Sequence, residues 1–168
     1  MNIDKAHVVQ VDQYVDMRQV ARYMGAEIGY YWPKTGKTDS VYQALKRMPH
    51  AQTYKKEALP KRFHFGSHPR VSPIVSISDE GWMQMTTEQF LRAQTNVNYS
   101  KGAHGHDNAL ASMRATFIAY GPAFKKGQTV APFDNIHLYA LLCHLLEITP
   151  APNDGQLAAI RSVLRKAP

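Results

Sequence analysis

The chain has 168 residues, of which 44% are hydrophobic and 20% are charged, and its formal net charge is +7. This length and composition suffice for one buried core and do not indicate two independent domains. No apolar run is long enough to span a bilayer, and the N-terminal segment lacks the basic start and apolar centre of a signal peptide. The single cysteine, Cys143, lies in an apolar stretch, so we expect a core residue and no internal disulfide.

Basic residues occur singly or in pairs, without a long basic run or a recognised nucleic-acid-binding motif. We therefore interpret the positive charge as a solvated surface. The alternative is that the charge favours anionic substrates such as nucleotides.

The N-terminal half of the chain is predicted to alternate between strands and helices. Met17, Val20 and Met24 recur at helical spacing, with Asp16 as a candidate N-cap and Gly25 as a stop. Three strands are also predicted: one at 8–11, an exposed one at 51–56 and a buried one at 73–78. A second helix is predicted between a cap at Ser40 or Asp39 and a stop at Pro49. Its apolar residues are Val41, Ala44, Leu45 and Met48.

The C-terminal half of the chain continues this alternation after a predicted loop at 96–107. An apolar run at 113–120 is rich in β-forming residues and predicts an interior strand. Asn135 is a candidate cap for a helix through Leu146, and a short helix is predicted at 156–165. Strands that alternate with helices indicate a layered α/β fold.

The segment 29–38, GYYWPKTGKT, ends in the Gly-Lys-Thr of a phosphate-binding loop and precedes a predicted helix. The first glycine of such a loop belongs five residues before Gly36, where Tyr31 stands. The bulky aromatic residues also leave no room for backbone amides to surround a phosphate. We therefore expect an aromatic strand leading to a turn, and keep a nucleotide-binding module as a distant alternative.

The most informative segment is 102–108, GAHGHDN, in which two glycines enclose a turn that carries His104 and His106. Glycine lets the backbone adopt positive φ, and Asp107 and Asn108 can cap the turn or orient an imidazole. A His-x-His pair alone is too short for a zinc site, which needs three or four ligands. The turn is therefore a candidate metal-ligand turn of moderate specificity.

The sequence around this turn strengthens its interpretation as a metal-ligand turn. The run from Gly102 to Phe124, then Phe133-Asp134-Asn135, and then the run from Tyr139 to Gly155 resemble the C-terminal part of the nucleotide pyrophosphatase/phosphodiesterase family of the alkaline phosphatase superfamily. Arg62-Phe63-His64-Phe65 and the run from Pro73 to Trp82, which ends in Asp-Glu-Gly-Trp, resemble upstream segments of the same enzymes. The resemblance covers about residues 49 to 155 in the family's own order.

This resemblance implies a partial alkaline-phosphatase-like layered α/β/α fold, with residues 1–168 as the C-terminal part of the catalytic domain. It also implies two Zn²⁺ ions held by six Asp and His side chains, with His104 as one ligand and Asp107 and Asn108 supporting it. The position of His106 departs from the family pattern, so we interpret His106 as a polar neighbour at the site mouth. The implied substrate is a nucleotide or another phosphodiester.

Two elements of the family are not found in this sequence: the segment with the Thr or Ser nucleophile, and the Asp-His-Gly-Met element with two further ligands. We therefore expect a C-terminal fragment, inactive alone, whose partner is the missing N-terminal half of the domain. Strand edges left by that half would be exposed. Three hypotheses follow: a piece of a zinc phosphodiesterase, a non-catalytic remnant or partner-dependent subunit, and a nucleotide-binding module. Relatives are exported, so the absence of a signal peptide fits a lost N-terminus.

Overall fold

The chain forms two compact units in the computed structural model, which describes residues 3–96 and 102–165. The first unit is Met1–Ala115 and the second is Thr116–Pro168. Within the described residues, no helix is both long and apolar enough to cross a membrane. The assignment of the whole chain to one catalytic domain stays a prediction.

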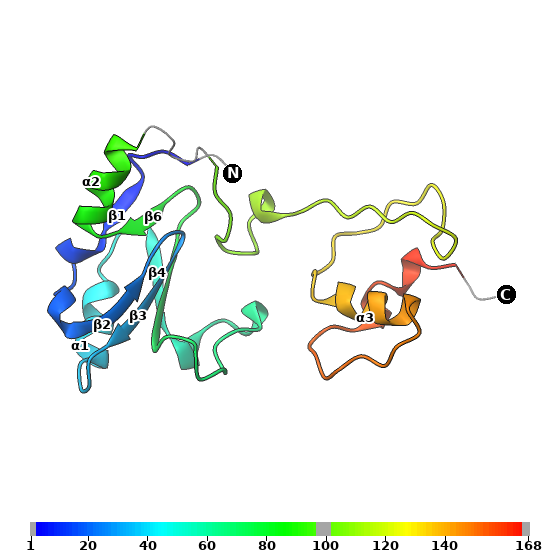
Figure 1. The fold of residues 1–168 in the computed structure, drawn as a ribbon, viewed down its shortest axis with the longest axis horizontal. Coiled ribbons are helices and arrows are strands. Elements are labelled where there is room, and N and C mark those ends of the chain that lie inside the picture. The colour runs from blue at the N-terminus through cyan, green and yellow to red at the C-terminus, as the bar shows by residue number, and fades with distance from the viewer. Residues whose placement is uncertain (1–2, 97–101, 166–168) are drawn as a thin grey trace. The chain divides into compact units, whose positions relative to one another are not determined.

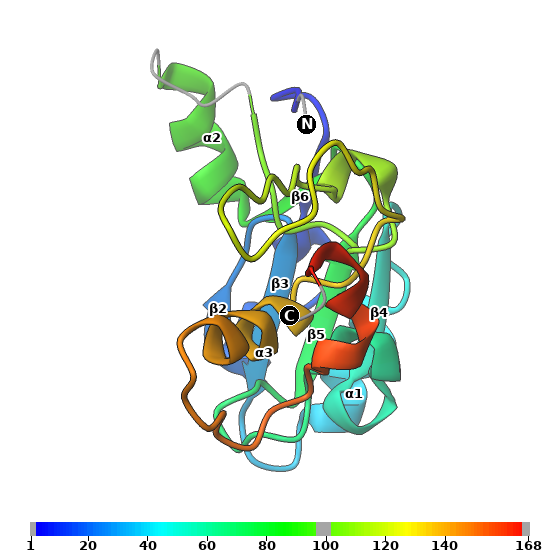
Figure 2. The same ribbon diagram turned by 90° about the vertical axis from the view of Figure 1, so that its right-hand side faces the viewer.

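A four-stranded antiparallel sheet is the centre of the first unit. Its strands are β2 (Val20–Met24), β3 (Ile28–Pro33), β4 (Ala51–Lys55) and β5 (Ile74–Ser78). They lie side by side in the order β2-β3-β5-β4, as Figure 2 shows. All five residues of β5 are buried, which confirms the prediction of a buried strand there. The strand predicted at 51–56 is confirmed as β4, at the edge of the sheet.

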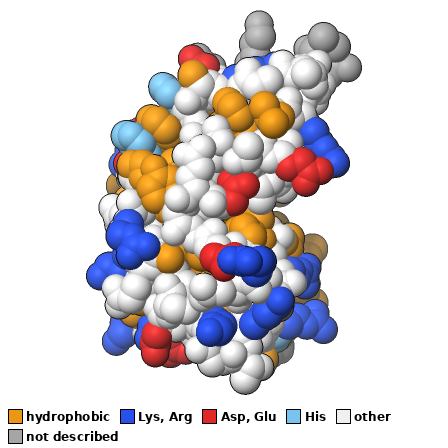
Figure 3. All heavy atoms as spheres, turned by 90° about the vertical axis from the view of Figure 1, so that its left-hand side faces the viewer, with side chains coloured by type: hydrophobic (Ala, Val, Ile, Leu, Met, Phe, Trp, Pro, Cys, Tyr) orange, Lys and Arg blue, Asp and Glu red, His pale blue; other side chains and the backbone are white. Residues whose placement is uncertain are grey.

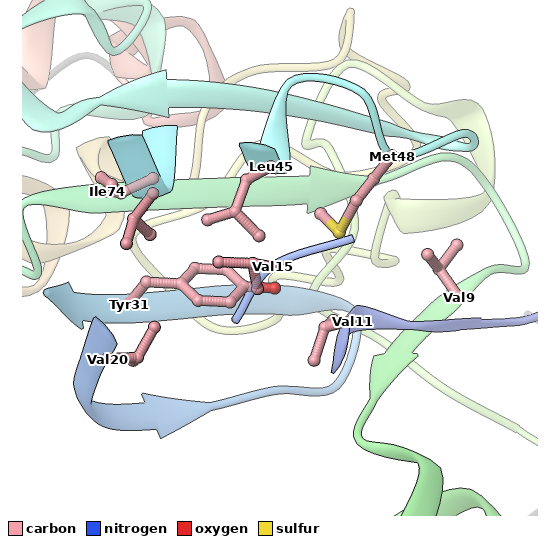
Figure 4. Packing of buried hydrophobic residues seen from close by; sticks show 9 residues of the cluster. Val9, Val11, Val15, Val20, Tyr31, Leu45, Met48 and Ile74 are labelled. Carbon is pink, nitrogen blue, oxygen red and sulfur yellow. The ribbon is translucent and has the colours of Figure 1, made fainter. Parts of the chain in front are cut away.

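One face of the sheet packs against α1 (Thr38–Leu45), and together they build the largest core. Tyr31 and Ile74 point from the sheet toward Leu45 of the helix, and all three are fully buried (Figure 4). Burial of a Leu or Ile side chain contributes about 1.5–3 kcal/mol. The rest of this cluster is Val9, Val11, Val15, Val20, Val41 and Met48. The helix predicted around Val41 and Leu45 is therefore confirmed.

The opposite face of the sheet is covered by the segment between β4 and β5. Leu59 and Val71 of this segment pack with Val75 and Ile77 of β5 in a second cluster. The segment itself contains two single 3-10 turns, Lys56–Ala58 and Lys61–Phe63. The sheet thus lies between a helix and an irregular covering segment.

A smaller parallel pair, β1 (Val8–Gln10) with β6 (Met83–Met85), lies beside α2 (Thr87–Thr95), as Figure 1 shows. Thr86 and Gln89 form a reciprocal capping box that starts α2. The strand predicted at 8–11 is confirmed, whereas α2 was not predicted. Buried Gln84 accepts a hydrogen bond from the Tyr31 hydroxyl at 2.7 Å and donates one to the Ser76 carbonyl at 2.9 Å. This amide links the parallel pair to the main sheet.

The helix predicted from Met17, Val20 and Met24 was wrong. Asp16 does cap a helical turn, by accepting a hydrogen bond from the Arg18 backbone N–H at 3.0 Å. That turn is a single 3-10 turn over Met17–Gln19, and the chain then extends as β2. Pairing with β3 decides the outcome, because backbone hydrogen bonds of a sheet outweigh a weak helical pattern.

The second unit is organised around α3 (His137–Leu145), which packs on Ile160, Val163 and Leu164. Cys143 is buried, which confirms its prediction as a core residue. The helix predicted at 156–165 is instead two 3-10 turns, Leu157–Ala159 and Arg161–Val163. The interior strand predicted at 113–120 was also wrong. Residues 114–120 have no regular secondary structure, and Ile118 and Tyr120 are 85% and 96% exposed.

Candidate functional site

The His104 turn follows β5, β6 and α2 in the first unit. Gly105 has φ +95°, in the left-handed region that glycine adopts without strain, and a Cβ there would meet open space. A second turn follows Gly105, because the Leu110 N–H donates a hydrogen bond to the Asp107 carbonyl at 3.1 Å. The His104 side chain is exposed to solvent. A positive-φ glycine next to an exposed imidazole fits the predicted presentation of a ligand. Residues 97–101 of the loop predicted at 96–107 lie outside the described residues.

Arg62 fastens this turn to the segment that covers the sheet. Its guanidinium donates to both carboxylate oxygens of Asp107 in a bidentate ion pair, and to Asn108 Oδ1 at 2.6 Å. Asp107 also accepts the Ala109 backbone N–H at 2.8 Å. Asp107 and Asn108 thus support the turn, and they do so through an arginine that lies in a distant part of the sequence.

The electrostatics of the pair follow from these bonds. The hydrogen bonds from Arg62 lower the pKa of Asp107 from its ordinary value, and the Ala109 N–H adds to the effect, while partial burial opposes it. The same hydrogen bond raises the pKa of Arg62. Asp107 is therefore ionised at neutral pH. The guanidinium offsets its charge, so Asp107 is not a spare base beside His104.

His106 is buried rather than at the mouth of a site. Its side chain is 5% exposed, and Nδ1 lies 3.5 Å from the Ser78 carbonyl at the end of β5. Its Nε2 is buried without a hydrogen-bond partner. The prediction of a polar neighbour at the site mouth was wrong in this respect, whereas its exclusion as a metal ligand stays a prediction.

A small cavity of about 120 Å³ lies between the turn and the ends of β4 and β5. Asp79, Glu80 and Asp107 line it together with Tyr54. Binding sites for small molecules usually have about 300–1,000 Å³. This space is too small for a nucleotide.

Trp82 lies next to the same strand end. Its indole stacks on the His50 imidazole at 3.6 Å between centroids and on that of His7 at 4.8 Å. His50 Nδ1 in turn lies 3.6 Å from Asp79 Oδ2. Trp82 thus holds together three segments that are distant in the sequence, which gives it a structural role.

The described residues contain no group of three or more His, Cys, Asp or Glu side chains that could hold a metal ion. A zinc ion needs at least three protein ligands. His104 fits the chemistry of one ligand, because imidazole nitrogen is a common zinc donor and the side chain is exposed. A complete zinc site would require ligands from outside the described part of this chain.

The Gly36-Lys37-Thr38 segment is a turn into α1. Gly36 has φ +72°, and α1 begins at Thr38 after an aromatic strand, as expected.

On the face drawn in Figure 3, Lys and Arg side chains are interspersed with acidic and apolar ones. That face has no continuous basic stripe, which agrees with a solvated charged surface.

Sequence reasoning identified His104, Asp107 and Asn108 but missed Arg62 as their partner. Arg62 belongs to the basic pair Lys61-Arg62 and to the Arg-Phe-His-Phe segment, and 45 residues separate it from Asp107. An aspartate and an asparagine side by side in a turn indicate that some donor is bound. They do not indicate which of the basic residues supplies it.

Comparisons with known proteins show which family the chain is similar to. Residues 1–107 match the family model described as type I phosphodiesterase/nucleotide pyrophosphatase. The chain is 37% identical over 163 residues to human ectonucleotide pyrophosphatase/phosphodiesterase family member 5, covering 95% of this chain and 32% of that protein. It is 32% identical to a mouse bis(5'-adenosyl)-triphosphatase, covering 95% of this chain and 33% of that protein.

Solved structures agree. Human ectonucleotide pyrophosphatase/phosphodiesterase 5 matches with a TM-score of 0.87 and 34% identity, over 99% of this chain and 43% of the solved chain. The murine protein in an inactive form, in complex with AMP, matches with a TM-score of 0.83 and 36% identity, over 98% of this chain and 42% of that one. The α/β fold expected from the resemblance is thereby confirmed. The chain spans about a third of the length of these curated relatives.

Proposed function

The chain belongs to the type I phosphodiesterase/nucleotide pyrophosphatase family, and we propose that it is the C-terminal part of a zinc-dependent hydrolase. Its substrates would be phosphodiester or pyrophosphate bonds of nucleotides or related diesters. Two relatives support nucleotides: one is named for a bis(5'-adenosyl) triphosphate, and one solved structure holds AMP. The observation that carries the proposal is the exposed His104, presented on a glycine turn that Arg62 anchors.

His104 would be one of six Asp and His ligands to two zinc ions in the complete enzyme. When bound, such ions activate a nucleophile and stabilise developing negative charge on phosphoryl oxygens. The chain's own residues would contribute position. Gly105 allows the turn, and Arg62 holds it through Asp107 and Asn108.

The nucleophile and the other ligands would come from chain outside these 168 residues. The relatives supply the first support, since they are about three times as long as this chain. Exposed apolar side chains of the second unit supply the second support. They lie in two segments, 118–120 and 139–148, and exposed apolar patches usually mark a covered interface. They are Ile118, Tyr120, Tyr139, Leu142, Leu146 and Ile148.

The test is a complete protein with and without His104→Ala. We expect the variant to lose zinc, measured by atomic absorption after dialysis, and to lose hydrolysis of a chromogenic nucleotide phosphodiester. His144→Ala is a matched control, because this histidine is also exposed but belongs to the helix α3 and not to the glycine turn. Normal zinc content and turnover in His104→Ala would remove His104 from the proposed site.

The alternative is a non-catalytic remnant or a subunit that needs a partner. It is favoured for the 168-residue chain alone, because one candidate ligand leaves each metal below its minimum coordination. The purified chain with added zinc is then expected to show only trace phosphodiesterase activity. Zinc-dependent turnover that disappears in His104→Ala would overturn this alternative.

A further inference from the structure

A second and larger cavity, of about 430 Å³, is lined in part by the covering segment. It lies between the β2–β3 strands and the segment 64–72, and its volume is typical of small-molecule sites. His104, Asp107 and Asn108 do not line it. No role in the proposed hydrolysis therefore accounts for this cavity.

Aromatic rings form much of its wall. Tyr30 and Trp32 point from β3 to the face opposite buried Tyr31, as alternate residues of a strand must. Phe65 meets Tyr30 edge to face, with ring centroids 6.3 Å apart, and is 44% exposed. A planar ligand would find stacking surfaces here.

The ionisable side chains that line the cavity are basic. Arg70 and two histidines, His64 and His68, line it, and no carboxylate side chain is among the lining residues that the structure describes. Arg22 does not line the cavity, but its guanidinium lies 4.8 Å from the centroid of the Trp32 ring. A guanidinium binds phosphate or carboxylate through paired N–H donors, so the cavity combines stacking surfaces with an anion partner.

Hydrogen bonds and a close backbone approach fix the segment that carries these groups. The Arg70 backbone N–H donates to His68 Nδ1 at 3.2 Å, which makes Nδ1 the acceptor and leaves Nε2–H as the donor of that imidazole. Gly66 has φ +122°, and a Cβ there would lie 2.9 Å from the Lys56 carbonyl oxygen. The segment that forms this wall therefore has a defined conformation, and it packs against the 3-10 turn that follows β4.

We propose that this cavity binds a nucleoside monophosphate, with the base stacked on Trp32 and Phe65 and the phosphate held by Arg70. The ligand class follows from the wall: aromatic faces accept any base, and a cationic rim without carboxylates selects for the phosphate. Binding here needs neither zinc nor hydrolysis, so it stands or falls separately from the proposed activity.

The chain has two tryptophans, which makes a direct test possible. In a Trp82→Phe background, Trp32 is the single tryptophan reporter of the 168-residue chain and lines the cavity. AMP titrated without zinc should quench the Trp32 emission saturably. Adenosine and inorganic phosphate should each bind at least about tenfold more weakly, because each offers only half of the contacts.

Variants separate the two halves of the site. Arg70→Gln should weaken AMP at least about tenfold and leave adenosine unchanged, since it removes a charged hydrogen-bond donor. Phe65→Ala should weaken AMP and adenosine alike. Arg47→Gln is the matched control, because Arg47 is an exposed arginine of the same unit that does not line the cavity. The absence of saturable quenching, equal binding of inorganic phosphate, or equal losses in Arg70→Gln and Arg47→Gln would each overturn the proposal.

Discussion

Replacing Asp107 by Asn should weaken the anchor of the His104 turn by a measurable and pH-dependent amount. The bidentate bond from Arg62 is favourable, but the Arg62 and Asp107 side chains are 44% and 27% exposed, so solvent screens the pair. Exposed pairs contribute up to about 1 kcal/mol, and the bidentate geometry places this one near that limit. We therefore expect a coupling energy of about 0.5–1 kcal/mol between the two residues at pH 7.

The pH dependence has a definite sign. The pKa of Asp107 is lowered in the folded state, so the pair contributes fully above the unfolded carboxyl value of about 3.9. The contribution is lost as the pH falls through the lower folded pKa. Asn at this position retains Oδ1 for the Ala109 N–H and for one Arg62 N–H, but it replaces the Oδ2 acceptor of the second Arg62 bond by an NH2 donor.

The assay is a double-mutant cycle with Arg62→Gln and Asp107→Asn, in which urea unfolding gives the free energy of unfolding at pH 7 and pH 3. The matched control is the cycle of Arg92 with Glu88, an i,i+4 pair whose side chains are 78% and 73% exposed. Its coupling should be smaller, about 0.3–0.5 kcal/mol. A coupling of zero at pH 7 between Arg62 and Asp107, or one that persists unchanged at pH 3, would refute the reasoning.

Three further substitutions test the surroundings of the site by thermal unfolding. Gln84→Leu should destabilise the first unit by about 2–4 kcal/mol, because the buried Tyr31 hydroxyl loses its acceptor; an unchanged midpoint would contradict this. His106→Phe should raise the free energy of unfolding by about 1 kcal/mol, since it removes a buried nitrogen without a partner; a lower midpoint would mean that the site cannot take the larger ring. Trp82→Phe should cost less than about 1.5 kcal/mol, because a second aromatic ring can still stack on His50, whereas loss of the fold would contradict that.

Elements with a clear apolar pattern between breaker residues could be predicted from the sequence. The buried strand β5 and the helix α1 follow from apolar pattern and flanking breakers, and both are present. The helix predicted around Met17 was wrong because strand pairing with β3, a non-local interaction, outweighs its pattern. A capping box was present in Thr86 and Gln89 and could have revealed α2.

The segment 113–120 shows why an interior strand cannot be predicted from propensity alone. A β-rich apolar run becomes a strand only when neighbouring strands supply hydrogen-bond partners. Here Ile118 and Tyr120 are almost fully exposed, and no strand forms around them among the described residues. The sequence therefore indicated a real preference for β structure. Among the described residues, no neighbouring strand pairs with this segment.

The role of Asp107 also changes once its partner is known. The sequence left two roles open for Asp107 and Asn108, which could cap the turn or orient an imidazole. In the structure both oxygens of Asp107 accept from Arg62, and one of them also accepts the Ala109 N–H. The support given to His104 therefore acts through the backbone of the turn rather than through a bond to the ring. A charge-neutral Asp107→Asn variant should consequently displace the turn as a whole, which couples the position of the candidate ligand to the salt link with Arg62.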